Sequence, residues 1–241
     1  MEHSGLRAES ALKQKGISVT MDELKGKKFI ASFSGGKDST LAIYRAINEG
    51  LKPFCLATAY KSDAILSWFH GMSAELLQNV SDSLSIPLKL IKTTGDKYNI
   101  NFEKALKEAA DNGAEVCVYG DIDIAGHFEW GNERCANAGL TPYFPLKNED
   151  RKEIVHEFID DGFSAVIKIV DTTRLPESFL GKMLTRETVA EIEKIGADVC
   201  GENGEYHTFV FDGPLFSNKV NYVVKEKIVQ DKYAILNIDV R

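Results

Sequence analysis

Strand-like and helix-like segments alternate through the first half of this 241-residue chain. Four short apolar runs are each followed by a segment whose apolar residues recur at helical spacing. The expected strands cover residues 27–33, 52–60, 87–93 and 114–122, and the expected helices cover 38–49, 70–85, 101–113 and 127–139. Alternation of this kind predicts an α/β fold with a doubly wound parallel sheet, covered by helices on both faces. In such sheets, ligands bind beyond the carboxyl ends of the strands.

The second half of the chain is less regular, and we expect it to form a smaller C-terminal α+β domain. It contains an extended segment at 140–146, helices at 151–162 and 186–198, a strand at 164–171, a turn-rich loop leading into a strand at 200–216, and an alternating β-hairpin at 220–240. No linker marks a boundary, and we place one near residue 140. The expected organisation is an N-terminal arm over 1–26 without assigned function, a first domain over 27–140 and a second over 141–241.

Composition and charge limit the partners of the chain. A formal net charge of −7 and a pI near 5.4 argue against broad binding to nucleic acid, which is not an expected partner. No apolar stretch is long enough to span a membrane, and the polar N-terminus lacks the core of a signal peptide. The four cysteines form no C-x-x-C pair, so we expect small buried hydrophobic residues rather than a zinc or redox site. We expect a cytoplasmic protein, and leave a homodimer open.

The first expected strand runs into the sequence F-S-G-G-K-D-S-T, residues 33–40. Paired glycines between a strand and a helix let the backbone approach a polyanion, at which the turn's N–H groups and the positive helix end point. The hydroxyls of Ser34 and Ser39 are further donors and Lys37 is a point charge, while the Asp38 carboxylate suits a hydrated magnesium ion.

Two common phosphate-binding motifs do not fit this turn. A P-loop, G-x-x-x-x-G-K-[ST], requires a glycine where Ala31 stands and a hydroxyl residue where Asp38 follows Lys37. The dinucleotide pattern G-x-G-x-x-G is absent because Gly35 and Gly36 are adjacent. A plain tight turn without a ligand is the structural alternative.

S-G-G-K-D-S instead resembles the PP-loop, the S-G-G-x-D-S signature of the ATP pyrophosphatases. The resemblance implies a five-stranded sheet of the adenine nucleotide alpha hydrolase-like type, with ATP and Mg²⁺ as cofactors. It also implies that ATP is cleaved between its α and β phosphates. The turn would hold the β,γ-pyrophosphate while a substrate oxygen attacks the α-phosphate to form an adenylate. Residues 27–140 would then be the ATP-binding domain and 141–241 the substrate-binding domain.

Two further stretches narrow this resemblance. Y-G-D-I-D-I-A-G-H-F-E-W-G-N-E-R-C-A-N-A-G-L-T-P-Y-F-P-L (119–146) and C-G-E-N-G-E-Y-H-T-F-V-F-D-G-P-L-F (200–216) are similar to the diphthine–ammonia ligase-like branch of the N-type ATP pyrophosphatases. That branch combines a G-D/A-I turn, a W/R-x-x-x-C helix, a G-L…P-L segment and an E-x-G-E-[FY]-x-T loop. The resemblance implies ATP-dependent amide formation, in which ammonium reacts with an adenylated carboxylate. The acceptor would be diphthine on elongation factor 2 or a small metabolite.

The candidate site residues follow from these motifs. We expect Lys37, Asp38, Glu202 and Glu205 to be catalytic, the two glutamates by binding ammonium or taking its proton. ATP would be bound by Ser34, Gly35, Gly36, Lys37, Asp38, Ser39, Ala57, Thr58, Gly120 and Asp121, with Asp38 also the Mg²⁺ ligand. Substrate would be bound by His127, Trp130, Asn203, Gly204, Tyr206 and His207.

Structural and functional alternatives stay open at this point. The two glutamates could only stabilise a turn, His127 could be structural, Trp130 could only pack, and Cys200 is expected to be structural. His70 and His156 are expected at the surface. Two other functions remain, a tRNA-modifying PP-loop enzyme and an ATP- or AMP-binding module without catalysis. The missing C-x-x-C pair and acidic pI disfavour the first, and the complete signature disfavours the second.

Overall fold

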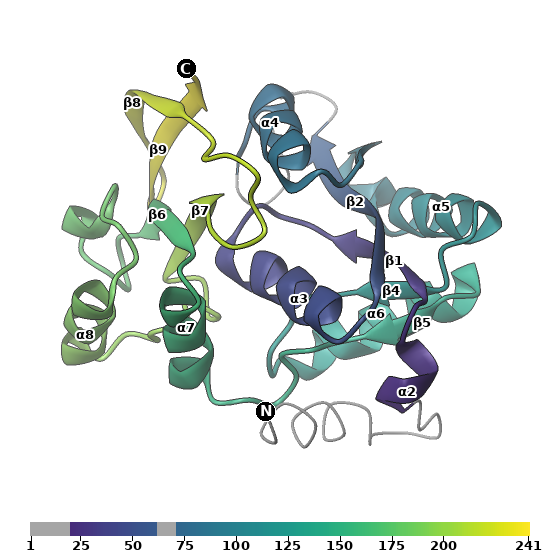
Figure 1. Ribbon diagram of the computed structural model, residues 1–241. Helices are drawn as coiled ribbons and strands as arrows, with labels where there is room; N and C mark the ends of the chain where they lie inside the picture. The colour runs from purple at the N-terminus through teal and green to yellow at the C-terminus, as the bar shows by residue number, and fades with distance from the viewer. Residues whose placement is uncertain (1–19, 62–70) are drawn as a thin grey trace. The chain divides into compact units, whose positions relative to one another are not determined.

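The computed structural model describes residues 20–61 and 71–241 (Figure 1). The expected N-terminal arm falls mostly outside these residues, as does His70. Of the arm, residues 20–26 are described, and they contain the short helix α2 (Met21–Leu24). Thr20 caps this helix in a box with Glu23, whose carboxylate accepts the Thr20 N–H at 2.7 Å.

Five parallel strands form the first sheet, as expected (Figure 1). They are β1 (Lys28–Ser32), β2 (Lys52–Lys61), β3 (Leu88–Thr93), β4 (Val116–Val118) and β5 (Thr141–Tyr143), in the order β3-β2-β1-β4-β5. All four neighbouring pairs are parallel. The strand order reverses at β1, which places the turn after β1 at the switch point where parallel sheets bind ligands.

Helices follow the strands, as the periodicity predicts. They are α3 (Lys37–Asn48), α4 (Ala74–Leu84), α5 (Tyr98–Asp111) and α6 (Ala125–Ala138), with a short 3-10 helix, η1 (Gly95–Lys97), before α5. On one sheet face, Ile30, Cys117 and Tyr119 join a buried cluster with side chains of α5 and α6. On the other face, Phe29 and Ala31 are equally buried. Both faces of the sheet are therefore covered, which is why its strands are apolar runs without polar alternation.

An antiparallel sheet occupies the C-terminal part of the chain. Its strands are β6 (Ser164–Asp171), β7 (Tyr206–Asp212), β8 (Tyr222–Gln230) and β9 (Tyr233–Val240), in the order β7-β6-β9-β8. The pairs β6–β7, β6–β9 and β8–β9 are all antiparallel, and β8–β9 is the expected hairpin. The helices of this part are α7 (Arg151–Asp160), α8 (Arg186–Ile195) and the 3-10 helix η2 (Glu177–Phe179). The α+β expectation for this region is confirmed.

The described chain divides into two compact units that are not continuous in sequence. The first contains residues 20–33, 38–61 and 86–149. The second contains 150–241 together with two earlier segments, 34–37 and 71–85. The last crossing falls between Glu149 and Asp150, later than the boundary near residue 140 that the sequence suggested. Residues 34–37 of the glycine turn thus belong to the second unit, while Asp38 and Ser39 belong to the first.

Candidate active site

The glycine turn is held on strand β7 through its backbone. The N–H of Lys37 donates to Thr208 Oγ1 at 3.0 Å, and the carbonyl of Gly35 accepts from the Val210 N–H at 3.0 Å. Inside the turn, Ser34 Oγ accepts from the Gly36 N–H at 3.2 Å. Groups of β7, which is remote in sequence, therefore hold the turn in this shape without a ligand.

Gly35 shows why a glycine is needed at this point of the turn. Its φ of +78° lies in the left-handed region, where a side chain is unfavourable. A Cβ at this position would also stand 2.3 Å from Cε of Met72, which precedes α4 in the same unit. The segment before α4 therefore packs directly against the turn.

Lys37 lies at the first position of α3 and is almost fully buried, with 4% of its surface exposed. Its Nζ is 5.6 Å from the centroid of the Tyr206 ring, a cation–π distance. The hydroxyl of Tyr206 donates to the Val199 carbonyl at 2.7 Å, which fixes the ring. The structure thus brings Tyr206, from the motif at 200–216, beside the lysine of the glycine turn.

In the first unit, the carboxyl ends of three strands meet at the start of α3. A Cβ on Gly120, just after β4, would be 2.7 Å from Ser39 N and 2.9 Å from Asp38 O. Only a glycine permits this close approach of two backbones. From β2, the Thr58 hydroxyl donates to the carbonyl of Phe33 at 2.6 Å, and the Phe33 N–H donates to Ala57 O at 2.9 Å. Ala57 and Thr58 therefore hold the end of β1, immediately before the turn.

Asp121 and His127 lie together beyond β4. Asp121 Oδ1 is 2.9 Å from His127 Nδ1, and the histidine side chain is 53% exposed. Burial, together with the nearby Asp121 carboxylate, raises the pKa of Tyr98 to about 12. This end of α6 therefore carries a solvent-facing polar pair, suited to contact a ligand.

Trp130, further along α6, makes the contacts of a packing residue. Its indole Nε1 donates to Asn99 Oδ1 at 2.8 Å, and its ring centroid lies 5.2 Å from that of Phe102 and 5.9 Å from that of Tyr98. These contacts favour the structural alternative raised for this residue. His156, in α7, is partly exposed.

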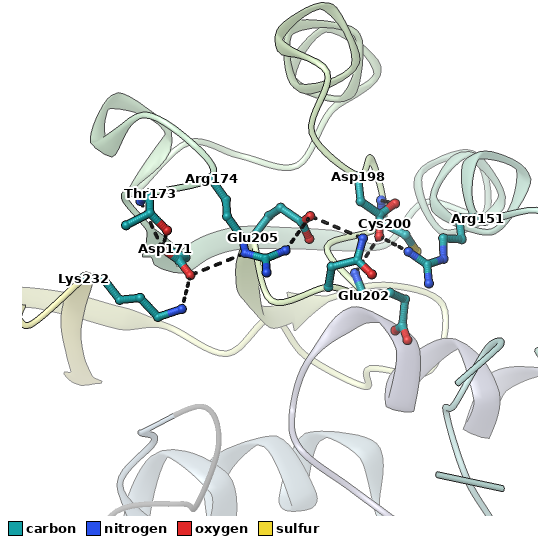
Figure 2. A network of polar contacts seen from close by, with 10 residues as sticks. Arg151, Asp171, Thr173, Arg174, Asp198, Cys200, Glu202, Glu205 and Lys232 are labelled. Atoms are coloured by element: carbon teal, nitrogen blue, oxygen red, sulfur yellow. Dashed lines mark hydrogen bonds and ion pairs between the residues drawn. The ribbon is translucent and has the colours of Figure 1, made fainter. Parts of the chain in front are cut away.

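The loop at 198–205 is organised by one carboxylate (Figure 2). Asp198 accepts from the N–H groups of Cys200 at 3.1 Å and Glu202 at 2.8 Å. It also accepts from Arg151 Nη1, at the start of α7, at 2.6 Å. With Asp198 and Arg151 anchoring it, the loop presents exposed Asn203 and partly buried Gly204 and Glu202 at its tip. Cys200 is buried, as are the other three cysteines, and all four are free thiols.

Glu205 differs from Glu202 in its burial. Only 5% of its surface is exposed, and its Oε1 lies 3.4 Å from Asn203 Nδ2 and 3.7 Å from Arg174 Nη1 (Figure 2). Its Oε2 is buried and has no hydrogen-bond partner in the described part of the chain. A buried carboxylate oxygen without a donor is costly, so it is a strong candidate to accept from a ligand. His207, two positions on in β7, is partly buried.

Asp171, at the end of β6, holds the backbone of Glu205 in place. Its N–H donates to the Glu205 carbonyl at 2.9 Å, and its carboxylate accepts from Thr173 Oγ1 and Lys232 Nζ, each at 2.6 Å (Figure 2). Desolvation acts to raise the pKa of Asp171, but the hydrogen bonds from Lys232 and Thr173 outweigh it and hold the pKa below its ordinary value. Arg174 lies between Asp171 and Glu205, 3.8 Å and 3.7 Å from their respective carboxylates.

Several residues of this arrangement were not among the candidates, including Thr208, Asp198, Arg151 and Asp171. Thr208 is the threonine of the E-x-G-E-[FY]-x-T loop, so a role for it could have been inferred from the motif. Asp198 precedes the same loop at a spacing typical of Asx turns. Arg151 and Asp171 carry no comparable local signal, because the loop residues that they contact, Asp198 and Glu205, are tens of positions away.

Neither a cluster of potential metal ligands nor a membrane-spanning helix is found among the described residues. Within residues 20–61 and 71–241, no three histidine, cysteine, aspartate or glutamate side chains are grouped so that they could hold a metal ion. Mg²⁺ often needs only one or two carboxylates when phosphates supply the other oxygens, so Asp38 alone remains compatible with it. Over the same residues, no helix combines the length and apolar character needed to cross a membrane.

Comparison with known proteins places the chain in a family. The N-terminal domain model of diphthamide synthase matches residues 27–142, and the C-terminal domain model matches 150–240. The diphthine–ammonia ligase of Homo sapiens is 36% identical over 236 residues, covering 85% of this chain and 86% of that protein. The enzyme of the same name from Bos taurus is 36% identical over 222 residues, covering 79% and 80%. The one from Danio rerio is 24% identical over 238 residues, covering 86% and 91%.

Among solved structures, that of a predicted subunit of tRNA methyltransferase from Methanocaldococcus jannaschii aligns with a TM-score of 0.42 and 15% identity, over 76% of this chain and 96% of that one. A likeness this distant bears on neither fold nor function. The domain matches and the human relative are much stronger, and they show that this chain belongs to the diphthine–ammonia ligase family and is a ligase.

Proposed function

We propose that this protein is an ATP-dependent ligase that converts the carboxylate of diphthine to an amide with ammonia, releasing AMP and pyrophosphate. The relatives are named for diphthine and ammonia, and the turn at 34–39 carries the full S-G-G-x-D-S signature. In this proposal residues 27–140 serve ATP binding and 141–241 serve substrate binding. A substrate on elongation factor 2 would place the reaction in the cytoplasm.

The proposed reaction has two steps, adenylation of the carboxylate and displacement of AMP by ammonia. A carboxylate oxygen of the substrate attacks the α-phosphorus of ATP, which breaks the bond to the bridging oxygen and releases pyrophosphate. The acyl adenylate is a good electrophile because AMP is a good leaving group. Ammonia then attacks the acyl carbon, AMP leaves, and the nitrogen gives up a proton as the amide forms. The protein must therefore hold polyphosphate, neutralise charge at the α-phosphate, and deliver ammonia as a free base.

The turn at 34–39 is suited to hold the pyrophosphate portion. Its backbone is fixed on β7 by Thr208 and Val210, so the loop keeps its shape when an anion binds, while the Lys37 N–H itself stays donated to Thr208 Oγ1. Lys37 contributes a buried positive charge, and the N-terminal end of α3 favours an anion. Asp38 is the residue that would ligate Mg²⁺, which would neutralise phosphate charge when bound.

Glu205 is the residue proposed to bind ammonium and to accept its proton. Its buried Oε2 lacks a hydrogen-bond donor among the described residues, and the adjacent Tyr206 ring lies beside Lys37 of the glycine turn. A carboxylate oxygen of this kind suits ammonium, which has four N–H donors and a positive charge. The same carboxylate can take the proton that ammonium must lose before attack. This single observation favours an amide-forming reaction over simple nucleotide binding.

The remaining candidates have supporting roles in this proposal. Gly120 shapes the start of α3, and Ala57 and Thr58 hold the end of β1. Asp121 and His127 form a polar pair that would contact nucleotide or substrate. His207, Asn203 and Gly204 would contact the substrate carboxylate or the group that bears it. Asp198 and Asp171 keep the glutamate loop in place.

The decisive experiment follows AMP and pyrophosphate formation with ammonium and elongation factor 2 that carries diphthine. Parallel reactions use a library of small carboxylates, and transfer RNA in place of a carboxylate. Stoichiometric AMP, pyrophosphate and amide with the elongation factor are expected. Turnover with a small carboxylate alone would assign another acceptor. Pyrophosphate release that depends on transfer RNA would overturn the amide ligase, and ATP binding without any turnover would leave a binding module.

A further inference from the structure

A buried lysine in β6 has no role in the function proposed so far. Lys168 is 1% exposed, in a strand whose other interior residues are apolar. The register between β6 and β7 shifts between Ile167 and Ile169, which pair with Thr208 and His207 respectively. Lys168 is thus the extra residue of a β-bulge, a feature that often re-aims a side chain next to a functional site.

Among residues 20–61 and 71–241, one hydrogen bond is found for this ammonium. A lysine ammonium has three N–H donors, and Lys168 Nζ donates to the Gly71 carbonyl at 3.2 Å. Within the described residues, no other acceptor and no carboxylate pairs with it. Burial lowers the pKa of Lys168 to about 8, so the side chain is still mainly charged at neutral pH. Burying a charge with two unmet donors is unfavourable unless an anion completes the site.

Two of the segments beside Lys168, strand β7 and the segment before α4, also contact the glycine turn. Thr208, across the bulge, accepts the N–H of Lys37. Gly71, the acceptor of the ammonium, precedes Met72, which packs against Gly35. The lysine is therefore connected to the turn from two sides, by the β6–β7 pairing and by the segment that leads into α4.

We propose that Lys168 is a second cationic residue of the anion site at the glycine turn, and that its ammonium donates to a phosphate oxygen of ATP or pyrophosphate. A hydrogen bond to the Gly71 carbonyl alone could be made by a neutral donor. A phosphate oxygen would interact with both the positive charge of Lys168 and its remaining N–H groups. The four-carbon stem lets the ammonium leave Gly71 when the anion arrives. This inference rests on the proposed function, because it takes the turn at 34–39 to hold phosphates.

The test measures binding of inorganic pyrophosphate and, separately, of ATP to the full-length protein by calorimetry. The variants are Lys168→Met, Lys168→Gln and Lys168→Arg, with Lys225→Met, at an exposed position of β8, as the matched control. Lys168→Met and Lys168→Gln should weaken pyrophosphate binding roughly ten- to hundredfold, since a charged hydrogen bond is lost. Lys168→Arg should retain affinity within a few-fold, and Lys225→Met should match the unsubstituted protein.

A pH series separates contact from mere structure. Between pH 7 and 9 the unsubstituted protein should lose pyrophosphate affinity more steeply than Lys168→Arg, because the lysine loses its proton and the guanidinium does not. Pyrophosphate itself titrates in this range, but equally for both proteins. Thermal unfolding identifies any variant that does not fold, and Lys168→Gln keeps a polar donor if Lys168→Met fails.

Three outcomes would overturn the inference in distinguishable ways. Equal pyrophosphate and ATP affinity in the unsubstituted protein and all three Lys168 variants would leave Lys168 structural, with the proposed function intact. Unchanged pyrophosphate binding with weakened binding of diphthine-bearing elongation factor 2 would direct the ammonium to the substrate carboxylate. Absence of pyrophosphate and ATP binding in the unsubstituted protein would remove the proposed function and this inference together.

Discussion

Thr208 Oγ1 accepts the backbone N–H of Lys37 at 3.0 Å, although 171 positions separate the two residues in the chain. This bond sits at the junction between the glycine turn and α3, where a backbone donor has no helical partner. A side chain of the C-terminal motif thus shapes the turn that carries the N-terminal signature. The two sequence motifs act on one structural feature.

Replacing Thr208 by valine should loosen the turn while preserving side-chain shape. The buried Lys37 N–H would lose its acceptor, at a cost of roughly 1–3 kcal/mol in unfolding free energy. ATP affinity should fall in parallel, because the turn is no longer held ready for the anion. Urea unfolding and calorimetric ATP titration measure the two effects. Thr208→Ser keeps the hydroxyl and should restore both, so an equal loss in the serine variant would contradict this account.

Lys37→Ala and Asp38→Ala should each abolish AMP formation and leave the fold intact. Lysine removal deletes the buried charge of the turn, and aspartate removal deletes the expected Mg²⁺ ligand. The measurement is AMP release by chromatography, with circular dichroism as the check on folding. Normal turnover by either folded variant would show that the turn is not a PP-loop.

Glu205→Gln should separate the two halves of the reaction. ATP binding and pyrophosphate release depend on the turn and should change little, while amide formation should need at least roughly tenfold more ammonium, because a charged hydrogen bond is lost. The measurement is the initial rate of amide formation at varied ammonium concentration, with the amide product quantified by mass spectrometry. Glu202→Gln is the comparison, since Glu202 is more exposed. A defect in Glu202→Gln with none in Glu205→Gln would exchange their roles.

Gly120→Ala should destabilise the protein despite being a single methyl group. The new Cβ would stand 2.7 Å from Ser39 N, and backbone can move only by displacing the start of α3. Overpacking of this kind costs roughly 1–3 kcal/mol in unfolding free energy. Gly126→Ala is a matched control, because that glycine lies in α6 with nothing within 4 Å of its Cβ position. It should be neutral or slightly stabilising, by up to about 1 kcal/mol.

Lys168→Met should raise stability at neutral pH, as expected when a functional charge is buried. Burial lowers the pKa of Lys168 from 10.5 to about 8, so the unfolded chain binds more protons between these values. The cost of this lysine is therefore full below pH 8, on the order of 3 kcal/mol, and disappears as pH rises toward 10.5. Urea unfolding across pH 7–10.5 should show the advantage of the variant shrinking with pH. An advantage independent of pH would assign it to packing instead.

Much of the fold followed from local patterns in the sequence. The apolar run predicted at 164–171 is β6, residue for residue, and the helix predicted at 38–49 is α3 to within one residue at each end. These elements depend on residue spacing and on stop signals such as Gly50, which need no partner elsewhere in the chain. By contrast, the sequence predicts only an extended segment at 140–146, and its residues Thr141–Tyr143 become the strand β5 through pairing with β4, because three residues that include a proline carry a weak strand signal.

The candidate site divides in the same way. The sequence by itself identified the residues of the glycine turn and the glutamate loop as candidates, because in each motif the polar and charged residues lie within a few positions of one another. Only the tertiary structure decided that Thr208 holds Lys37, that Asp198 and Asp171 hold the loop, that Trp130 packs, and that Glu205 is the glutamate with a buried, unpartnered oxygen. The reason is physical: burial and hydrogen-bond satisfaction depend on which distant groups surround an atom, and no local pattern specifies those neighbours.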